Sequence, residues 1–261
     1  SKPETQQLTQ VLQTETRAFV RNYLKDSFFW DELAQAWRNH QFEHQQDPQR
    51  SPKAGHGAWA AQRAALMAGL LDPAQKFRAQ LDRLLVQDAT NWPYIGERVN
   101  AAIDYFLPTL DTLESDLLWK LEEVGRMKKA KALYEEVVAL EERQLAAIHR
   151  LFKARLLVDA MVKGDEISKE TMSSPEMLQF RSQKLAAVRT AFRAANATVI
   201  EDGDDTHRYG PRKKQPKAPK KSTVAETHEL WLQKLSVRDI AAARQFTVQT
   251  IYNHLAKLIE A

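Results

Sequence analysis

The chain has 261 residues and a net charge of +4, and its 43% of hydrophobic residues suffices for a sizeable core, which excludes global disorder. The absence of cysteine excludes disulfides, thiolate catalysis and cysteine-based zinc sites. No apolar run approaches the roughly 20 residues of a membrane span, and the N-terminus lacks the apolar centre of a signal peptide. We therefore expect a soluble protein of the reducing cytoplasm with no membrane partner.

Glycine-rich motifs of enzymes are missing from the sequence. None of the eight glycines is followed by lysine, so the GxxxxGK[ST] phosphate loop is absent, and neither GxGxxG nor GxSxG occurs. These absences exclude nucleotide hydrolysis, dinucleotide chemistry and serine hydrolysis of the usual kinds from this chain. We predict no catalytic residue and no cofactor.

The N-terminal part of the chain is expected to be helical, because apolar residues recur at spacings near three and four while strand patterns are nearly absent. A first helix is predicted over residues 4–46, a loop over 47–57 and an alanine-rich helix over 58–71. Asp72-Pro73 predicts an N-cap and the start of a helix that runs to about residue 88.

Two long helices are expected to form a hairpin over residues 94–162. The first begins after Trp92-Pro93, and Pro108 is expected to kink or divide it. The chain is predicted to turn near Gly125, after which the apolar stripe resumes and continues to Val158. A single continuous helix is the alternative, but it would exceed about 100 Å.

A further helix is expected after the hairpin. Gly164 is a predicted C-cap, and Ser174-Pro175 is predicted to begin a helix that ends near residue 196. Residues 1–200 are therefore predicted to form an all-α domain, an elongated antiparallel helical bundle.

Residues 201–221 are predicted to be a flexible linker, acidic at first and then basic. Its last eleven residues hold three prolines and six positive charges without an acid, a composition that cannot bury a core. Those six charges exceed the net charge of the whole chain, so the remainder is mildly acidic. A solvated spacer without a binding role is the alternative interpretation.

The last forty residues, 222–261, are expected to fold as a helix-turn-helix domain. Helices are predicted over 227–234, 237–244 and 248–260, with Ser236 and Thr247 as N-caps of the second and third. A simple three-helix module is the alternative. Apolar contacts are expected from Leu230, Trp231, Ala241, Phe246, which plugs the turn, and from Ile251, Leu255 and Leu258.

The third helix is predicted to present a polar face opposite its apolar one. Polar side chains on the free face of such a helix suit contacts with bases in the major groove of DNA. The predicted base contacts are Gln249, Thr250, Tyr252 and Asn253. The predicted phosphate contacts are Arg244, Thr247, Lys257, Arg212, Lys213, Lys214, Lys217, Lys220 and Lys221.

The C-terminal segment STVAETHELWLQKLSVRDIAAARQFTVQTIYNHLAKLIEA resembles the helix-turn-helix domain near the C-terminus of bacterial DNA helicases, both RecQ-type and superfamily-one Pif-type. The resemblance rests on T-x-E-L-(W/F), S-(V/I)-x-x-I-A and (T/S)-V-x-T-I-x-x-H-L-A-x-L-I-E. The chain departs from the family at Gln245, where glycine is usual. The long helices and the proline-lysine linker also resemble, in layout alone, the region that precedes this domain in the Pif-type group.

The resemblance implies a non-catalytic accessory region of a DNA helicase, whose partners are DNA and the motor domain of the parent polypeptide. The chain stops where the third helix is expected to end, which suits a segment of a longer protein. The alternative is a stand-alone transcription regulator that dimerises through its long helices. A third hypothesis is a protein-interaction scaffold, and the oligomeric state is left open. The basic residues Arg126, Lys128, Lys129 and Lys131 are a further candidate contact for nucleic acid or a partner.

One metalloprotease pattern is present and is rejected. Residues His40 to His44 read H-x-x-E-H, and histidines four apart share a helix face, as zinc binding needs. The motif stands at a glutamine-rich helix end in a chain without strand patterns, whereas proteases of this kind resemble larger α/β domains. We expect two solvated histidines and no metal site. The third ligands considered were Glu114, Glu122 and Glu123.

Overall fold

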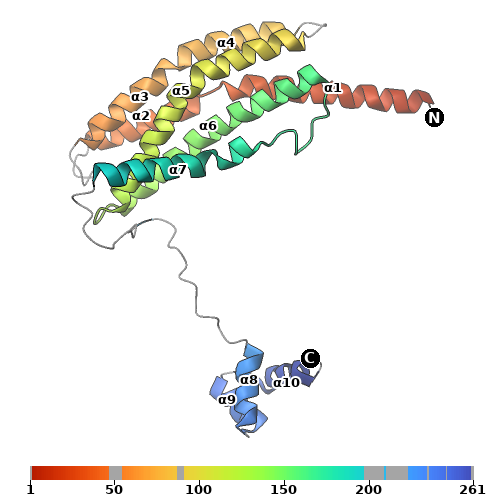
Figure 1. The fold of residues 1–261 in the computed structure, drawn as a ribbon, viewed down its shortest axis with the longest axis vertical. Helices are drawn as coiled ribbons and strands as arrows, with labels where there is room; N and C mark the ends of the chain where they lie inside the picture. The colour runs from red at the N-terminus through yellow and green to blue at the C-terminus, as the bar shows by residue number, and fades with distance from the viewer. Residues whose placement is uncertain are drawn as a thin grey trace. The chain divides into compact units, whose positions relative to one another are not determined.

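The computed structural model describes residues 2–46, 55–86, 91–196, 209, 223–233, 235–244 and 246–259. Within these residues all regular secondary structure is α-helical, which confirms the all-α prediction (Figure 1). The chain divides into two compact units, Ser1–Gly210 and Pro211–Ala261. None of the helices in the described part of the chain is long and apolar enough to cross a bilayer.

The first predicted helix is two helices in the structure, α1 (Lys2–Ser27) and α2 (Asp31–Gln46). The chain breaks between them so that Phe28 and Trp30 enter the core. The ring of Trp30 packs edge-on against Phe106, with centroids 4.9 Å apart, and Phe28 packs in the same way against Phe77 at 4.8 Å. The prediction of one helix was wrong because these contacts come from distant parts of the chain.

The next two helices are α3 (His56–Gly69) and α4 (Leu71–Leu85), joined by Leu70 alone. Leu70 itself keeps helical backbone angles, and no side chain caps the start of α4. Asp72 therefore lies inside the first turn, where it pairs with Lys76 at 2.7 Å. The predicted N-cap at Asp72 was wrong.

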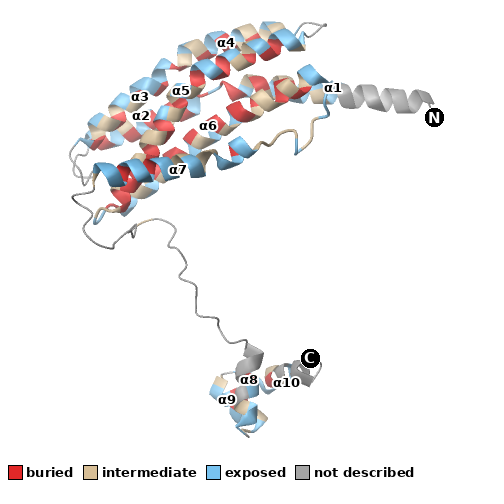
Figure 2. Ribbon diagram, viewed as in Figure 1, coloured by how far each residue is buried: buried red, intermediate tan, exposed pale blue. Residues whose placement is uncertain are grey.

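The predicted hairpin is confirmed as α5 (Trp92–Gly125) and α6 (Lys131–Lys163), which pack against each other. Asn91 caps α5, since its side-chain oxygen accepts a hydrogen bond from the backbone N–H of Tyr94 at 3.1 Å. Buried residues line the facing sides of the two helices (Figure 2). Gly164 ends α6 in the left-handed conformation, with φ of 76°, as its sequence position predicted.

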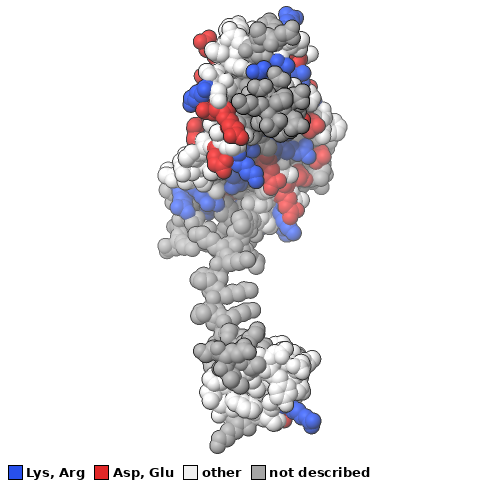
Figure 3. Space-filling model, turned by 90° about the vertical axis from the view of Figure 1, so that its right-hand side faces the viewer, with Lys and Arg blue, Asp and Glu red and all other residues white. Residues whose placement is uncertain are grey.

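Helix α7 (Pro175–Ala195) begins at the predicted Ser174-Pro175 pair, and Ser174 caps it, because its Oγ accepts from the N–H of Met177 at 3.1 Å. Three ion pairs join its basic residues to acids of the hairpin: Arg181 with Glu141 at 2.6 Å, Lys184 with Asp111 at 2.5 Å and Arg189 with Glu122 at 2.7 Å. On the face of the bundle in Figure 3, acidic and basic side chains are intermixed. Many charged side chains of the bundle therefore pair with one another.

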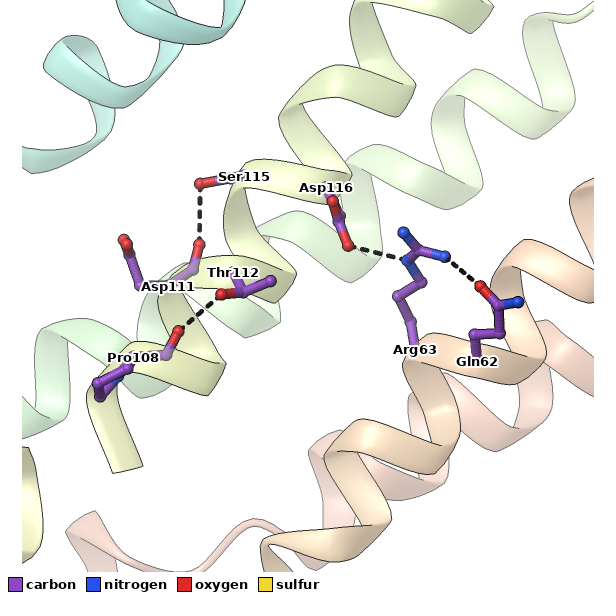
Figure 4. A network of polar contacts seen from close by, with 7 residues as sticks. All are labelled: Gln62, Arg63, Pro108, Asp111, Thr112, Ser115 and Asp116. Atoms are coloured by element: carbon purple, nitrogen blue, oxygen red, sulfur yellow. Dashed lines mark hydrogen bonds and ion pairs between the residues drawn. The ribbon is translucent and has the colours of Figure 1, made fainter. Parts of the chain in front are cut away.

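Helix α5 continues through Pro108, so the proline does not divide it. The hydroxyl of Thr112 donates to the carbonyl oxygen of Pro108 at 2.9 Å, and that of Ser115 donates to the carbonyl of Asp111 at the same distance (Figure 4). One turn further on, Asp116 accepts from Arg63 of α3 at 2.8 Å. The segment after the proline is thus tied to a neighbouring helix.

Most of the predicted linker, residues 201–208 and 210–221, lies outside the described residues. Tyr209 belongs to the N-terminal unit. Its hydroxyl oxygen accepts a hydrogen bond from the backbone N–H of Ala130 at 3.1 Å, and its ring packs against Tyr134. Tyr209, which stands within the predicted linker, therefore contacts the hairpin turn.

The expectation of two solvated histidines in the H-x-x-E-H motif was also wrong. His40 and His44 are buried, with exposed fractions of 7% and 3%. Helix α2 packs against both α3 and α6, and these contacts cover the histidine face.

The C-terminal unit consists of α8 (Thr223–Leu232), α9 (Val237–Arg244) and α10 (Val248–Ile259). The second helix has the predicted bounds. The first begins four residues earlier than predicted and ends two residues earlier. Each of the three helices packs against the other two.

Candidate nucleic-acid interface

Two side-chain caps position the second and third helices of the C-terminal unit. Ser236 Oγ accepts from the N–H of Asp239, and Thr247 Oγ1 accepts from the N–H of Thr250, both at 3.2 Å. The turn between the helices is closed by a bond from the N–H of Phe246 to the carbonyl of Ala241 at 3.0 Å. Both predicted N-caps are thus confirmed.

The core of this unit is small. Ile240, Ala241 and Ile251 are buried, and Leu230, Leu235, Val237 and Leu255 pack against them. Trp231 is 46% exposed and Phe246 is 39% exposed. The expectations that Trp231 anchors the core and that Phe246 plugs the turn were therefore wrong. The side chain of Leu258 lies outside the described residues.

The predicted reading face of α10 is open. Gln249 and Asn253 are both exposed, and Gln249 Nε2 donates to Asn253 Oδ1 at 3.2 Å. Tyr252, next to them, is 55% exposed. These side chains keep donors and acceptors for the edges of bases, because each amide uses only one of its groups in the bond between them.

Thr250 differs from the other predicted base contacts. It is half-buried, and its hydroxyl lies 2.8 Å from that of Thr247. Both threonines thus form hydrogen bonds that stabilise the first turn of the helix. Because α10 begins at Val248, they lie where backbone N–H groups without intrahelical partners attract a phosphate.

Arg244 is held within the unit. Its guanidinium donates to the hydroxyl of Thr227 and lies over the ring of Phe246, 5.0 Å from the centroid. Thr227 is buried, a polar core position that the sequence did not point to. The guanidinium must therefore share its donors with any phosphate.

The remaining predicted phosphate contacts fall outside what the structure describes. The side chain of Lys257 is in this class, as are Arg212, Lys213, Lys214, Lys217, Lys220 and Lys221. Gln245, where the sequence departs from the pattern of the helicase family, also lies outside the described residues.

The basic residues at the turn of the bundle hairpin divide into two kinds. Arg126 pairs with Glu122 at 3.4 Å and lies over the ring of Phe192 of α7. Lys128 and Lys129 are exposed. Lys129 is the one non-glycine residue with positive φ, 59°, in the described part of the chain. Arg126 therefore supports packing, and the two lysines face solvent.

Comparison with protein families gives two matches. Residues 11–174 match the DNA helicase middle domain, and residues 223–261 match a helix-turn-helix domain. The first match covers well over half of the chain and ends at Ser174, immediately before α7. No curated protein and no solved structure matches the chain.

Proposed function

The chain belongs to the DNA helicase middle-domain family and ends in a helix-turn-helix domain, and from this we propose that it is a bacterial helicase accessory region that binds DNA and contacts the motor domain. The observation that carries the proposal is the presence of both family matches in one chain. The phosphate loop of a motor is absent from the sequence, so the ATP-driven step belongs to another domain.

The open amide face of α10 supports DNA binding through the major groove. That groove admits an α-helix, and asparagine and glutamine pair with the edge of adenine through two hydrogen bonds. Gln249 and Asn253 are the exposed amides at successive turns of the helix. We assign base contacts to these two residues and to Tyr252, with Thr250 at the N-terminal end of the same face.

The linker supplies the electrostatic attraction in this proposal. Residues 222–261 contain four basic and four acidic residues, so the domain alone attracts phosphates weakly. The six basic residues over 211–221 adjoin the domain in the chain. If all six neutralise phosphates, the logarithm of the binding constant falls with the logarithm of salt concentration at a slope of about −5.

The test is fluorescence anisotropy of the full chain with labelled single-stranded, duplex and forked DNA over a salt series. We expect micromolar binding that falls steeply with salt, because phosphate contacts dominate it, with at most a modest sequence preference from the amides of α10. Lys217→Gln with Lys220→Gln should reduce the slope by about 2. The matched control, Lys163→Gln with Lys169→Gln, removes two exposed charges of the bundle and should leave the slope unchanged.

Two outcomes would overturn the DNA-binding part of the proposal. Tight binding to one duplex sequence by a two-fold dimer would favour a transcription regulator, whose recognition helices would be spaced by about 34 Å. The absence of binding at low salt would leave the helix-turn-helix as a protein-docking module.

Motor contact has its own test. The separately expressed motor domain of the parent polypeptide is mixed with the chain and followed by analytical ultracentrifugation. We expect a 1:1 complex, and two species that sediment independently at micromolar concentration would contradict the contact.

A further inference from the structure

Three histidines converge inside the bundle. His40 and His44 lie one turn apart on α2, and His56 is the first residue of α3. All three are buried, and one ring nitrogen of each lies within 4.8 Å of the other two. The His40 and His56 Nε2 atoms are 2.9 Å apart. The four-residue spacing in the sequence points to two of the three histidines, and the fold adds His56.

Two glycines place His56 against α2. Gly55, in the left-handed conformation with φ of 89°, turns the chain into α3. At Gly57 a Cβ atom would lie 2.9 Å from the backbone oxygen of His44, closer than packing allows. The start of α3 therefore approaches the backbone of α2 at the position of the second histidine, and a side chain at residue 57 would force the two helices apart.

A carboxylate stands beside the cluster. Glu136 Oε2 of α6 lies 2.8 Å from His44 Nε2 and 3.9 Å from His40 Nδ1. A carboxylate that accepts the N–H of one ring nitrogen leaves the other nitrogen as a lone-pair donor, the usual arrangement around histidines that bind metals. Glu136 thus fixes the ring of His44 and contributes negative charge.

The remaining neighbours enclose the cluster. The indole of Trp59 stacks on the ring of His56, with centroids 5.2 Å apart. Lys120 lies over the same indole at 4.8 Å, and Glu123, 2.5 Å from its ammonium, offsets its charge. Burial, with the charges of neighbouring histidines and Lys120, lowers the pKa of His40 to about 4 and of His56 to about 3.

We propose that His40, His44 and His56 form a structural site for a divalent transition metal of the zinc type, with Glu136 positioning His44. Zinc–nitrogen bonds of about 2.0–2.1 Å place tetrahedral ligands about 3.3 Å apart, and the three ring nitrogens already lie within 4.8 Å of one another. The metal fastens α2 to α3. Glu43, the remaining motif residue, is exposed, so the cluster lacks the buried base of a zinc protease.

The test is a titration of the full, chelator-treated chain with zinc, by calorimetry or competition with a chromophoric chelator. We expect one equivalent to bind at micromolar concentration or below and to raise the melting temperature. Magnesium, which prefers oxygen ligands, should do neither. His56→Ala should weaken zinc binding by more than tenfold, whereas His228→Ala, which removes an exposed histidine, should not change it.

The positioning role of Glu136 has a separate variant. Glu136→Gln should weaken zinc binding by about 10- to 100-fold, while Glu135→Gln on the exposed side of the same helix should leave it unchanged. Cobalt gives a readout on the unaltered chain, since tetrahedral nitrogen coordination produces intense visible absorption bands. Zinc affinity equal in the parent and in folded His56→Ala, or only weak octahedral cobalt bands, would overturn the proposal.

Discussion

The indole nitrogen of Trp37 donates a hydrogen bond to the side-chain oxygen of Gln144, 3.2 Å away, in the interior of the bundle. The amide nitrogen of Gln144 in turn donates to the backbone oxygen of Leu110 at 3.0 Å. This one fully buried amide therefore joins α2, α6 and α5. It satisfies buried polar groups on two helices, which makes it a specific contact between three helices of the bundle.

Replacing Gln144 by alanine should destabilise the bundle by about 1–3 kcal/mol, because the indole N–H is left buried without an acceptor. Urea unfolding followed by tryptophan fluorescence measures the change. Gln45→Ala, an exposed position on α2, is the control and should shift the free energy of unfolding by less than about 0.5 kcal/mol. Equal effects of the two substitutions would show that the buried bond contributes nothing specific.

Glu114 predicts a pH dependence of stability. Burial is the main cause that raises its pKa from 4.5 to about 9, the charges of Glu141 and Asp111 add to it, and Arg181 opposes them. Above pH 4.5 the unfolded chain has lost a proton at this position that the folded chain keeps. The contribution of Glu114 to the free energy of unfolding is therefore complete below pH 4.5 and declines as the pH rises to about 9.

Between about pH 7.5 and 9 the free energy of unfolding of the parent should fall by up to about 1.4 kcal/mol per pH unit. Glu114→Gln should flatten this decline, because an amide does not titrate. Glu142→Gln, an exposed neighbour of Glu141, should keep the parent's slope. Denaturant unfolding over the pH series gives all three slopes, and a parent slope near zero would contradict the prediction.

The amide pair of α10 predicts a loss of duplex affinity. Gln249→Ala with Asn253→Ala should weaken binding to duplex DNA at least about fivefold, since a well-made amide–adenine pair contributes about 1–3 kcal/mol. Gln179 and Gln183 on α7 are a matched control, exposed and joined by the same kind of side-chain bond at 3.0 Å. Anisotropy at one salt concentration compares the two double variants, and unchanged affinity in the first would remove the base-contact assignment.

Because Ile251 is buried in the core of the C-terminal unit, we predict that its substitution unfolds this unit selectively. Among the described residues it is one of three buried hydrophobic side chains in that unit, and Ile→Ala substitutions in cores cost about 2–5 kcal/mol. In Ile251→Ala, amide hydrogen exchange should become fast over residues 223–259 and stay slow in α5 and α6. Val248→Ala on the same helix, at a site 39% exposed, should keep the parent's pattern.

The sequence predicted the elements that carry their own local signals. Asn91, Ser174, Ser236 and Thr247 all cap helices through their side chains, and two of the four, Ser236 and Thr247, were predicted as caps. The helix break at Phe28 and the start of α4 at Leu71 were missed, since neither has a local cap and both follow from packing against distant helices.

The same distinction applies to the candidate sites. The exposed amide face of α10 follows from helical periodicity, so the exposure of Gln249 and Asn253 was predicted, and their contact with bases stays a prediction. The bond between Arg244 and Thr227 joins residues 17 positions apart and has no periodic signal. His56 was missed for a similar reason, although the glycines on either side of it, next to a pair of histidines four residues apart, were visible in the sequence.

The uninterrupted length of α5 has a geometric consequence. Its 34 residues, continuous through Pro108, extend over about 50 Å at 1.5 Å per residue. That is the rise of about 15 base pairs of duplex DNA at 3.4 Å each. Together with its antiparallel neighbour α6, the helix works as a rigid spacer. Any partner that touches both the Lys128–Lys129 turn and the opposite end near Trp92 must therefore span about 50 Å, a length equal to about one and a half turns of duplex DNA.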